Sequence, residues 1–119
     1  MEKTNEAPAV DAVKEIGEAE YEQAVLKATL PAVLDFYAAD SEPCKAWAPR
    51  FDAVAQKFAG KALFLRISKA KSTALAAKLS VTESPTLVFF KGGKEVGERL
   101  KGAAIERKAL KAAVEALLK

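Results

Sequence analysis

The sequence is poor in reactive side chains: its 119 residues include one cysteine and no histidine. A single cysteine cannot form a disulfide within the chain, and it argues against a disulfide-stapled secreted domain. The lack of histidine removes the side chain most often used for acid–base catalysis and metal binding. We therefore expect neither a metal site nor a cofactor.

Long apolar runs and basic stripes are also missing. No stretch of about 18 apolar residues predicts a membrane span. The first ten residues lack the apolar core of a signal peptide, so we expect a cytoplasmic protein. The net charge of +3 comes from interspersed lysine and glutamate. Glu106 and Glu115 interrupt the basic residues near the end of the chain, which are Arg107, Lys108, Lys111 and Lys119. We expect no nucleic-acid binding, which would favour an unbroken basic stripe with aromatic residues.

The chain does have enough apolar residues for one packed domain. Half of its residues are hydrophobic, and a chain of this length buries about two-thirds of its unfolded surface. We expect residues 1–9 to form a flexible tail and residues 10–119 to form one monomeric domain.

The hydrophobic pattern predicts strands and helices in alternation. The expected strands are 10–16, 32–37, 62–68 and a hairpin of 86–91 and 95–101; the expected helices are 18–27, 41–58, 72–79 and 104–118. We expect the last helix to bury Leu110, Val114, Leu117 and Leu118. Strand–helix–strand order implies parallel pairing. The fold class is therefore α/β, with a mixed sheet of four to five strands and about four helices.

Residues 31–49 join a buried strand to the start of a helix. The apolar run 32–37 is followed by a polar turn and then by a helical pattern. Pro43 suits the first turn of a helix, and Cys44, the chain's one cysteine, comes next. Unpaired amides and the helix dipole at such a place favour the thiolate form of a cysteine.

Two segments resemble the thioredoxin family. Residues 34–44, which read LDFYAADSEPC, are similar to the family's active-site segment. Ser84-Pro85-Thr86 resembles its cis-proline segment, and Gly102 matches a late glycine before the last helix. The resemblance covers residues 10–119 and implies the thioredoxin fold.

The chain departs from the family at the reactive residues. Thioredoxins have a tryptophan followed by Cys-Gly-Pro-Cys, whereas this chain has Asp40, Ser41, Glu42, Pro43 and Cys44 at those positions. In the family the first sulfur attacks a substrate disulfide and the second resolves the mixed disulfide. The resemblance therefore implies the fold without the dithiol reaction.

Cys44 allows two interpretations. It could be a reactive thiol that forms mixed disulfides with a partner or a small thiol. It could instead be a shielded cysteine, retained as a small apolar residue in the first turn. The matching sulfur of thioredoxins is the more buried of the pair, which favours the second interpretation. Lys45 adds positive potential near the thiol, and Asp40 and Glu42 oppose it.

Ser41 allows three interpretations. Its oxygen could cap the helix by accepting the backbone N–H of Cys44. Its hydroxyl could stabilise a thiolate, since Ser-x-Pro-Cys is similar to serine-type glutathione transferases and loosely to the Thr-x-x-Cys of peroxiredoxins. The chain is too short for the helical domain of the first family, and residues 37–40 lack the proline of the second. A serine nucleophile would need an adjacent base, and histidine is absent.

Asp35 places a carboxylate in the middle of an apolar strand, which is costly unless it has a role or a partner. It matches the family's buried aspartate, which lies behind the second cysteine and helps to move its proton. Alternatively, it is a relic paired with Lys61 or Arg66. Burial should raise its pKa.

Ser84-Pro85-Thr86 is the expected binding platform. In the family the backbone beside the cis-proline pairs with an extended substrate chain, although a purely structural turn is the alternative. Asp40, Glu42 and Glu83 would form an acidic rim around the platform, opposite Gly102. We expect this rim to select a basic or polar partner segment; otherwise these are three solvated carboxylates.

Three functions remain compatible with these residues. The first is a member of the thiol-disulfide oxidoreductase family that performs at most monothiol exchange through Cys44. The second is a non-catalytic binding module that uses the Pro85 platform. The third is a thioredoxin whose first cysteine was changed to serine by engineering. Asp40 and Glu42 favour natural divergence, because a single engineered change would not have altered both neighbours.

Overall fold

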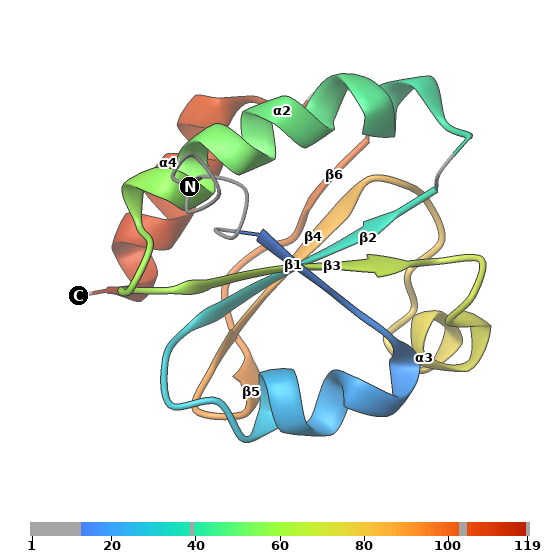
Figure 1. Cartoon of the computed structure of the whole chain (residues 1–119), viewed down its shortest axis with the longest axis horizontal. Helices are drawn as coiled ribbons and strands as arrows, with labels where there is room; N and C mark the ends of the chain where they lie inside the picture. The colour runs from blue at the N-terminus through green and yellow to red at the C-terminus, as the bar shows by residue number, and fades with distance from the viewer. Residues whose placement is uncertain (1–12, 39, 103–104, 119) are drawn as a thin grey trace, which may run out of the picture.

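The computed structural model describes residues 13–38, 40–102 and 105–118 (Figure 1). Its strands are β1 Val13–Ile16, β2 Ala32–Tyr37, β3 Leu63–Ser68, β4 Thr86–Lys91, β5 Lys94–Glu95 and β6 Leu100–Lys101. They form one sheet in the order β1-β3-β2-β4-β5, with β6 also paired to β4. β3 is parallel to β1 and β2, and β4 is antiparallel to β2, so the predicted mixed sheet is confirmed.

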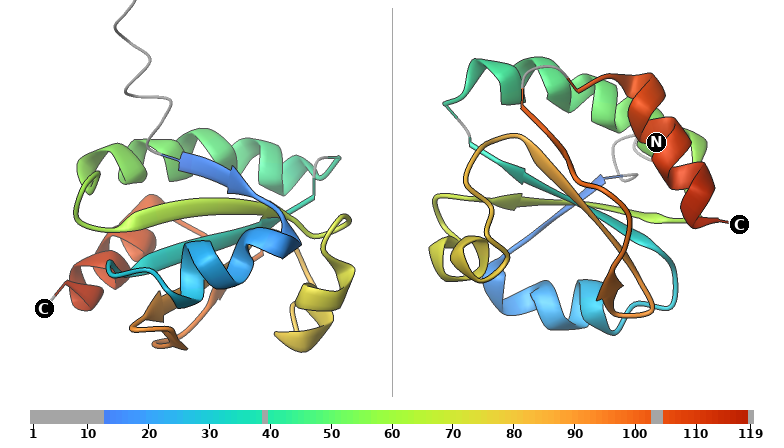
Figure 2. Two further views of the ribbon diagram at one scale, coloured as in Figure 1. Left: turned by 60° about the horizontal axis from the view of Figure 1, so that its bottom comes forward. Right: turned by 180° about the vertical axis from the view of Figure 1, so that it is seen from behind.

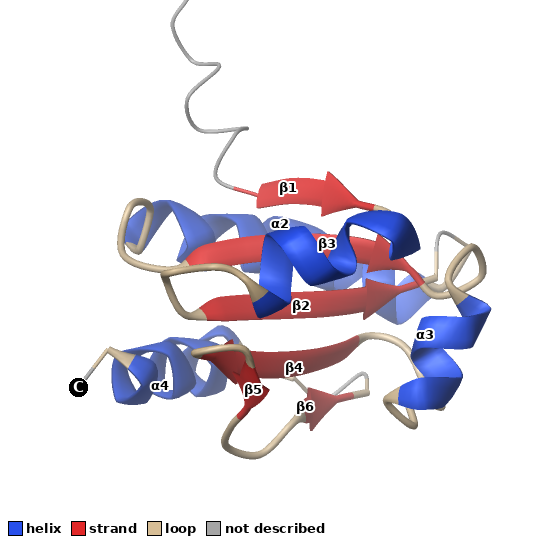
Figure 3. Cartoon of the chain, turned by 90° about the horizontal axis from the view of Figure 1, so that it is seen from below, coloured by secondary structure: helices blue, strands red, loops and turns tan. Residues whose placement is uncertain are grey.

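Helices cover both faces of this sheet (Figure 2). The helices are α2 Glu42–Lys57, α3 Thr73–Lys78 and α4 Arg107–Leu117, together with two short helical turns at Glu18–Glu20 and Glu22–Leu26. α2 and α4 lie on one face, and α3 lies with the two turns on the other (Figure 3). This is the three-layer α/β arrangement that the thioredoxin resemblance implied.

β2 is buried on both faces because it lies in the middle of the sheet between two layers of helix. Val33 packs with Trp47 and Phe51 under α2. Leu34 and Phe36 pack into the second apolar cluster, on the side of α3. A strand buried on both sides reads as a continuous apolar run, which explains the composition of this segment.

The segment predicted as one helix over 18–27 consists instead of two unlike turns. Glu18–Glu20 is a 3₁₀ turn and Glu22–Leu26 is a π-helical turn. The Glu18 carboxylate accepts the backbone N–H of Leu75 at 2.6 Å, which ties the start of the segment to α3. This tertiary contact helps to fix the local geometry, and the spacing of apolar residues does not reveal it.

Other boundaries also differ from the prediction: α2, β3 and α3 each begin one residue later, and α4 begins at Arg107 rather than at residue 104. The return strand predicted over 95–101 is split into β5 and β6, and Arg99 between them reaches back to Glu95, with 2.8 Å between Nε and Oε2. Leu118 is 38% exposed rather than buried, because α4 ends at Leu117 and its apolar face ends there too. The predicted tail, residues 1–9, lies outside the described residues. Within the described ranges, no helix is long and apolar enough to cross a membrane.

Candidate functional site

The candidate site begins where β2 ends and α2 starts. Ser41 has an extended backbone, and its Oγ accepts the backbone N–H of Cys44 at 3.4 Å. Its carbonyl accepts the N–H of Lys45 at 3.0 Å, which is the first hydrogen bond of the helix. Pro43 lies in the first turn, where its missing N–H costs nothing. The interpretation of Ser41 as the helix cap is thus confirmed.

Cys44 is shielded from solvent at this helix start. The residue is 4% exposed, and its Sγ accepts the backbone N–H of Ala38 at 3.3 Å. The hydrogen bond ties the sulfur to the chain between β2 and α2. A disulfide-bearing partner could reach this sulfur only after a local movement of the helix start.

Asp35 lies on the sheet face that α2 covers. Side chains alternate along a strand, and Val33, two residues earlier in β2, packs beneath α2 with Trp47 and Phe51. Asp35 is 2% exposed, and its Oδ1 has no hydrogen-bond partner among the described residues. The predicted buried carboxylate is therefore present, in the layer between the sheet and the helix that carries Cys44.

The pKa of Asp35 is raised to about 7, because burial disfavours the charged carboxylate. The positive charge of Arg66 opposes this rise in pKa. Arg66 is the register partner of Asp35 on β3, so it is the nearer of the two predicted partners, whereas Lys61 is exposed before that strand begins. A carboxyl group with this pKa can hold or release a proton near neutral pH.

Arg66 also belongs to a polar cluster on the same face of the sheet. Its guanidinium lies 4.1 Å above the centre of the Tyr37 ring. The hydroxyl of Tyr37 donates a hydrogen bond to the carboxylate of Glu15 on β1. Burial and this hydrogen bond raise the pKa of Tyr37 to about 12. The positive charge of Arg66 is therefore shared among several groups rather than reserved for Asp35.

The Ser84–Pro85 peptide bond is cis and immediately precedes β4, which begins at Thr86. The hydroxyl of Thr86 donates to the carbonyl of Glu83 at 2.7 Å. The backbone N–H of Gly102 donates to the carbonyl of Pro85 at 2.9 Å. The backbone N–H and carbonyl of Ser84 form no hydrogen bond with any described residue. Within the described part of the chain, Ser84 therefore has a free backbone edge.

A groove of about 310 Å³ separates the start of α2 from the end of β6. It is lined by Glu42, Pro43, Ala46, Trp47, Arg50, Gly102 and Ile105. A side chain at Gly102 would stand 3.2 Å from Oε1 of Glu83, so that carboxylate lies against the same wall. The structure thus brings Glu42, Pro43, Glu83 and Gly102 together.

The remaining predicted site residues are less closely joined. Ser84 and Thr86 flank Pro85, which is linked to the groove through its hydrogen bond with Gly102. Asp40 is exposed and lines none of the pockets found among the described residues. Glu42 forms an exposed ion pair with Lys45 at 3.6 Å, which offsets part of the acidic rim. Within the described ranges, no group of three acidic or cysteine side chains could hold a metal ion.

Arg50, which lines the groove from the third turn of α2, was not predicted as a site residue. The signal was available, because Pro43, Ala46 and Arg50 follow at helical spacing and so share one side of the helix. A second pocket, between α2 and α4, also includes Arg50 and collects basic residues from both helices. That grouping joins residues about half the chain apart, and no local pattern shows it.

Comparison with known proteins gives a consistent result. The family model for thioredoxin matches residues 12–116. Thioredoxin X, chloroplastic, of Arabidopsis thaliana is 33% identical over 106 residues, which are 89% of this chain and 58% of that protein. Thioredoxin of Haemophilus influenzae is 34% identical over 88 residues, 74% of this chain and 82% of that protein. Thioredoxin 1 of Nostoc sp. is 30% identical over 87 residues, 73% of this chain and 81% of that protein. The chain thus spans under two-thirds of the chloroplast relative and about four-fifths of the bacterial ones.

Proposed function

Because this chain belongs to the thioredoxin family, we propose that it binds an extended segment of a partner protein without completing a dithiol–disulfide cycle. One observation carries the proposal: the two positions that would react are both occupied by groups engaged in the helix start. Ser41 has no sulfur and uses its oxygen as a helix cap, and Cys44 is 4% exposed.

The free backbone edge at Ser84 supports binding of an extended chain. An extended segment can pair with an unpaired N–H and carbonyl as an added strand does. The groove beside it is lined by Pro43 of α2 and Gly102 after β6, so alternate side chains of the segment would find a place there. We place the partner in this groove and propose that the protein acts as a monomer.

The carboxylates around the platform define the preferred partner segment. Glu83 lies against Gly102, Glu42 lines the groove, and Asp40 is exposed just before α2. We propose that these three acids favour a segment with basic or polar side chains. The interaction is solvent-exposed, so it should weaken as ionic strength rises.

A second candidate function is monothiol exchange through Cys44, the chain's one cysteine, which lies in the first turn of α2 and whose Sγ accepts the Ala38 N–H. The Cys44 thiolate would attack a disulfide, form a mixed disulfide and release the other sulfur as a thiolate. No second cysteine is present to resolve the product. An external thiol would have to attack the mixed disulfide to regenerate Cys44.

The binding proposal is tested with three unstructured, cysteine-free peptides that differ only in charge: one rich in lysine, one neutral and one rich in glutamate. We expect the lysine-rich peptide to change the backbone amide signals of Ser84, Gly102 and Glu42 in nuclear magnetic resonance titrations. The triple variant Asp40→Lys, Glu42→Lys and Glu83→Lys should bind this peptide with about tenfold lower affinity at low salt. Each exposed ion pair between the rim and the peptide contributes up to about 1 kcal/mol.

A matched control is the triple variant Glu22→Lys, Glu98→Lys and Glu115→Lys, which reverses three exposed carboxylates away from the groove. It should lower the affinity for the lysine-rich peptide by about twofold or less, since these charges act on the groove only from a distance. An equal loss of affinity in the two triple variants would contradict the proposal that the acidic rim selects the partner segment. If the peptide changes the amide signals of residues remote from Ser84 instead, the proposal that it binds at the platform is contradicted.

A further inference from the structure

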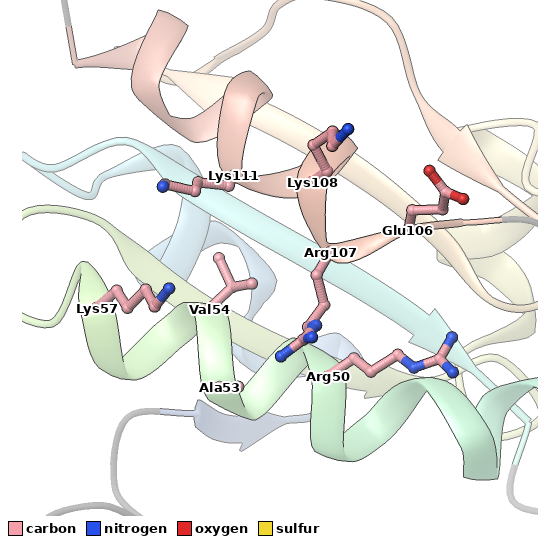
Figure 4. Close-up of a pocket in the computed structure, with 8 residues that line it drawn as sticks. All are labelled: Arg50, Ala53, Val54, Lys57, Glu106, Arg107, Lys108 and Lys111. Carbon is pink, nitrogen blue, oxygen red and sulfur yellow. The ribbon is translucent and has the colours of Figure 1, made fainter.

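A second pocket, of about 530 Å³, lies between α2 and α4 and has no part in the proposed function (Figure 4). Its charged lining consists of Arg50 and Lys57 from α2, Arg107, Lys108 and Lys111 from α4, and Glu106 just before α4. Five cations and one carboxylate leave a surplus of four positive charges in one concave site. Ala53 and Val54 provide an apolar floor.

The basic side chains of this pocket are available to a ligand. All five are exposed, and none forms an ion pair with another described residue. Figure 4 shows Arg107 reaching down from α4 toward α2, while the side chain of Arg50 lies along α2. The two helices therefore each supply a guanidinium group, the side chain best suited to hold phosphate through two parallel hydrogen bonds.

We propose that this pocket binds a compact anion that carries two or more phosphate groups. Such a ligand concentrates several negative charges in a small volume, which matches a surplus of four positive charges. A pocket of about 530 Å³ falls within the range, roughly 300–1,000 Å³, that small-molecule sites occupy. The backbone N–H groups at the start of α4 add to the attraction for an anion.

The lining favours a compact phosphate ligand over a nucleic-acid strand or an acidic protein segment. No aromatic residue lines this pocket, so it offers no surface on which bases could stack. Glu106 lies at one end of the basic group and would repel an anionic chain that continued past it. A short ligand that stays between α2 and α4 avoids this repulsion.

The test uses tripolyphosphate as the probe and the full chain as the protein. Isothermal titration calorimetry at about 0.15 M ionic strength should give saturable binding of one tripolyphosphate per chain. The double variant Lys57→Gln and Lys111→Gln should weaken the binding by about tenfold, because two exposed charge contacts are lost. Arg50→Lys with Arg107→Lys keeps the charge and should still weaken binding, because the planar fork is lost.

The matched control is Lys14→Gln with Lys71→Gln, which removes two exposed cations from β1 and from the loop before α3. It should change the affinity for tripolyphosphate by about twofold or less. Circular dichroism checks that every variant is folded. Equal weakening in the two lysine double variants would mean that tripolyphosphate senses net charge alone, and would overturn the proposal. Saturable binding of a single-stranded oligonucleotide or a polyglutamate peptide without binding of tripolyphosphate would also overturn it.

The outcome does not depend on the peptide-binding groove. Arg50 is the residue that the two pockets share, so the lysine variants leave the groove lining intact. If tripolyphosphate fails to bind while the lysine-rich peptide still binds at Ser84, the phosphate site is wrong and the proposed function stands. If the lysine-rich peptide fails to bind while tripolyphosphate binds, the proposed function is wrong and the phosphate site stands.

Discussion

Ser41→Cys is expected to give the protein a disulfide between residues 41 and 44, and with it the ability to reduce protein disulfides. The Ser41 side chain already lies over the first turn of α2, with Oγ 3.4 Å from the backbone nitrogen of Cys44. The spacing of two intervening residues is also that of the thioredoxin family's cysteine pair. A sulfur at this position would be the more exposed of the two, because residue 41 is partly exposed and Cys44 is buried.

The gain is measured in two steps. A mild oxidant should remove two electrons and two protons from the variant, which mass spectrometry detects as the loss of two hydrogens without dimer formation. With dithiothreitol as the electron donor, the variant should then reduce insulin disulfides by roughly tenfold or more above the rate of the unmodified chain. The loss of the Ser41 helix cap should cost about 1 kcal/mol of stability, which leaves the fold intact.

Two controls separate this result from general thiol reactivity. Ser41→Cys combined with Cys44→Ser has one cysteine and should neither form the internal disulfide nor cycle. Glu42→Cys places a second thiol on the neighbouring residue, at the wrong spacing, and should also remain inactive. A variant that forms the 41–44 disulfide but never reduces insulin would show that Asp40 and Glu42 have changed the groove beyond the loss of one sulfur.

Asp35→Asn is expected to make the protein more stable at alkaline pH. The pKa of Asp35 is raised from 3.8 in the reference state to about 7 by burial. Between these two values the unfolded chain has lost the proton that the native protein keeps. The native state then binds more protons, so stability falls as the pH rises through this window.

The full loss of stability is reached above the pKa of Asp35 in the native protein. It amounts to roughly 4 kcal/mol at most, since one pKa unit corresponds to about 1.4 kcal/mol. Asparagine has nearly the same shape and no charge, so the variant should avoid most of this cost. We expect the free energy of unfolding of the variant to exceed that of the unmodified protein by about 3 kcal/mol at about pH 8.5. Near pH 4 the two free energies should agree within about 1 kcal/mol.

Urea unfolding at a series of pH values measures this difference. Asp52→Asn is the matched control, because Asp52 is a partly exposed aspartate in α2. Its unfolding free energy should follow the pH dependence of the unmodified protein. A constant difference between Asp35→Asn and the unmodified protein at all pH values would contradict the assignment of a buried, titrating carboxyl group.

The arrangement of strands and helices could be predicted because each element has a clear local signal. The apolar run of β2 requires burial on both sides, and the Ser41-x-Pro43 pattern places the start of α2 to within one residue. The turns at 18–26 were predicted less well, since the contact between Glu18 and Leu75 joins segments distant in sequence. Leu118 was misassigned because an apolar residue just past a helix end no longer follows the helical period.

The candidate site could be predicted in part for the same reason. Ser41, Pro43 and Cys44 are neighbours in sequence, so their geometry follows from the rules for helix starts. Asp35 could be predicted as a costly buried carboxylate, but its proximity to Arg66 depends on strand register, which the sequence does not specify. The basic pocket could not be predicted, because Arg50 and Lys111 line one pocket only after two helices pack on one face of the sheet.

We propose that Cys44 is a shielded thiol in a protein that lacks the dithiol cycle. The most direct test is the rate of Cys44 alkylation by iodoacetamide in the native protein and in urea, with intact mass measured after exposure to oxidised glutathione. We expect slow alkylation in the native protein, rapid alkylation in urea, and no glutathione adduct on the native protein. Rapid native alkylation together with a glutathione adduct would contradict it and would establish monothiol exchange through Cys44.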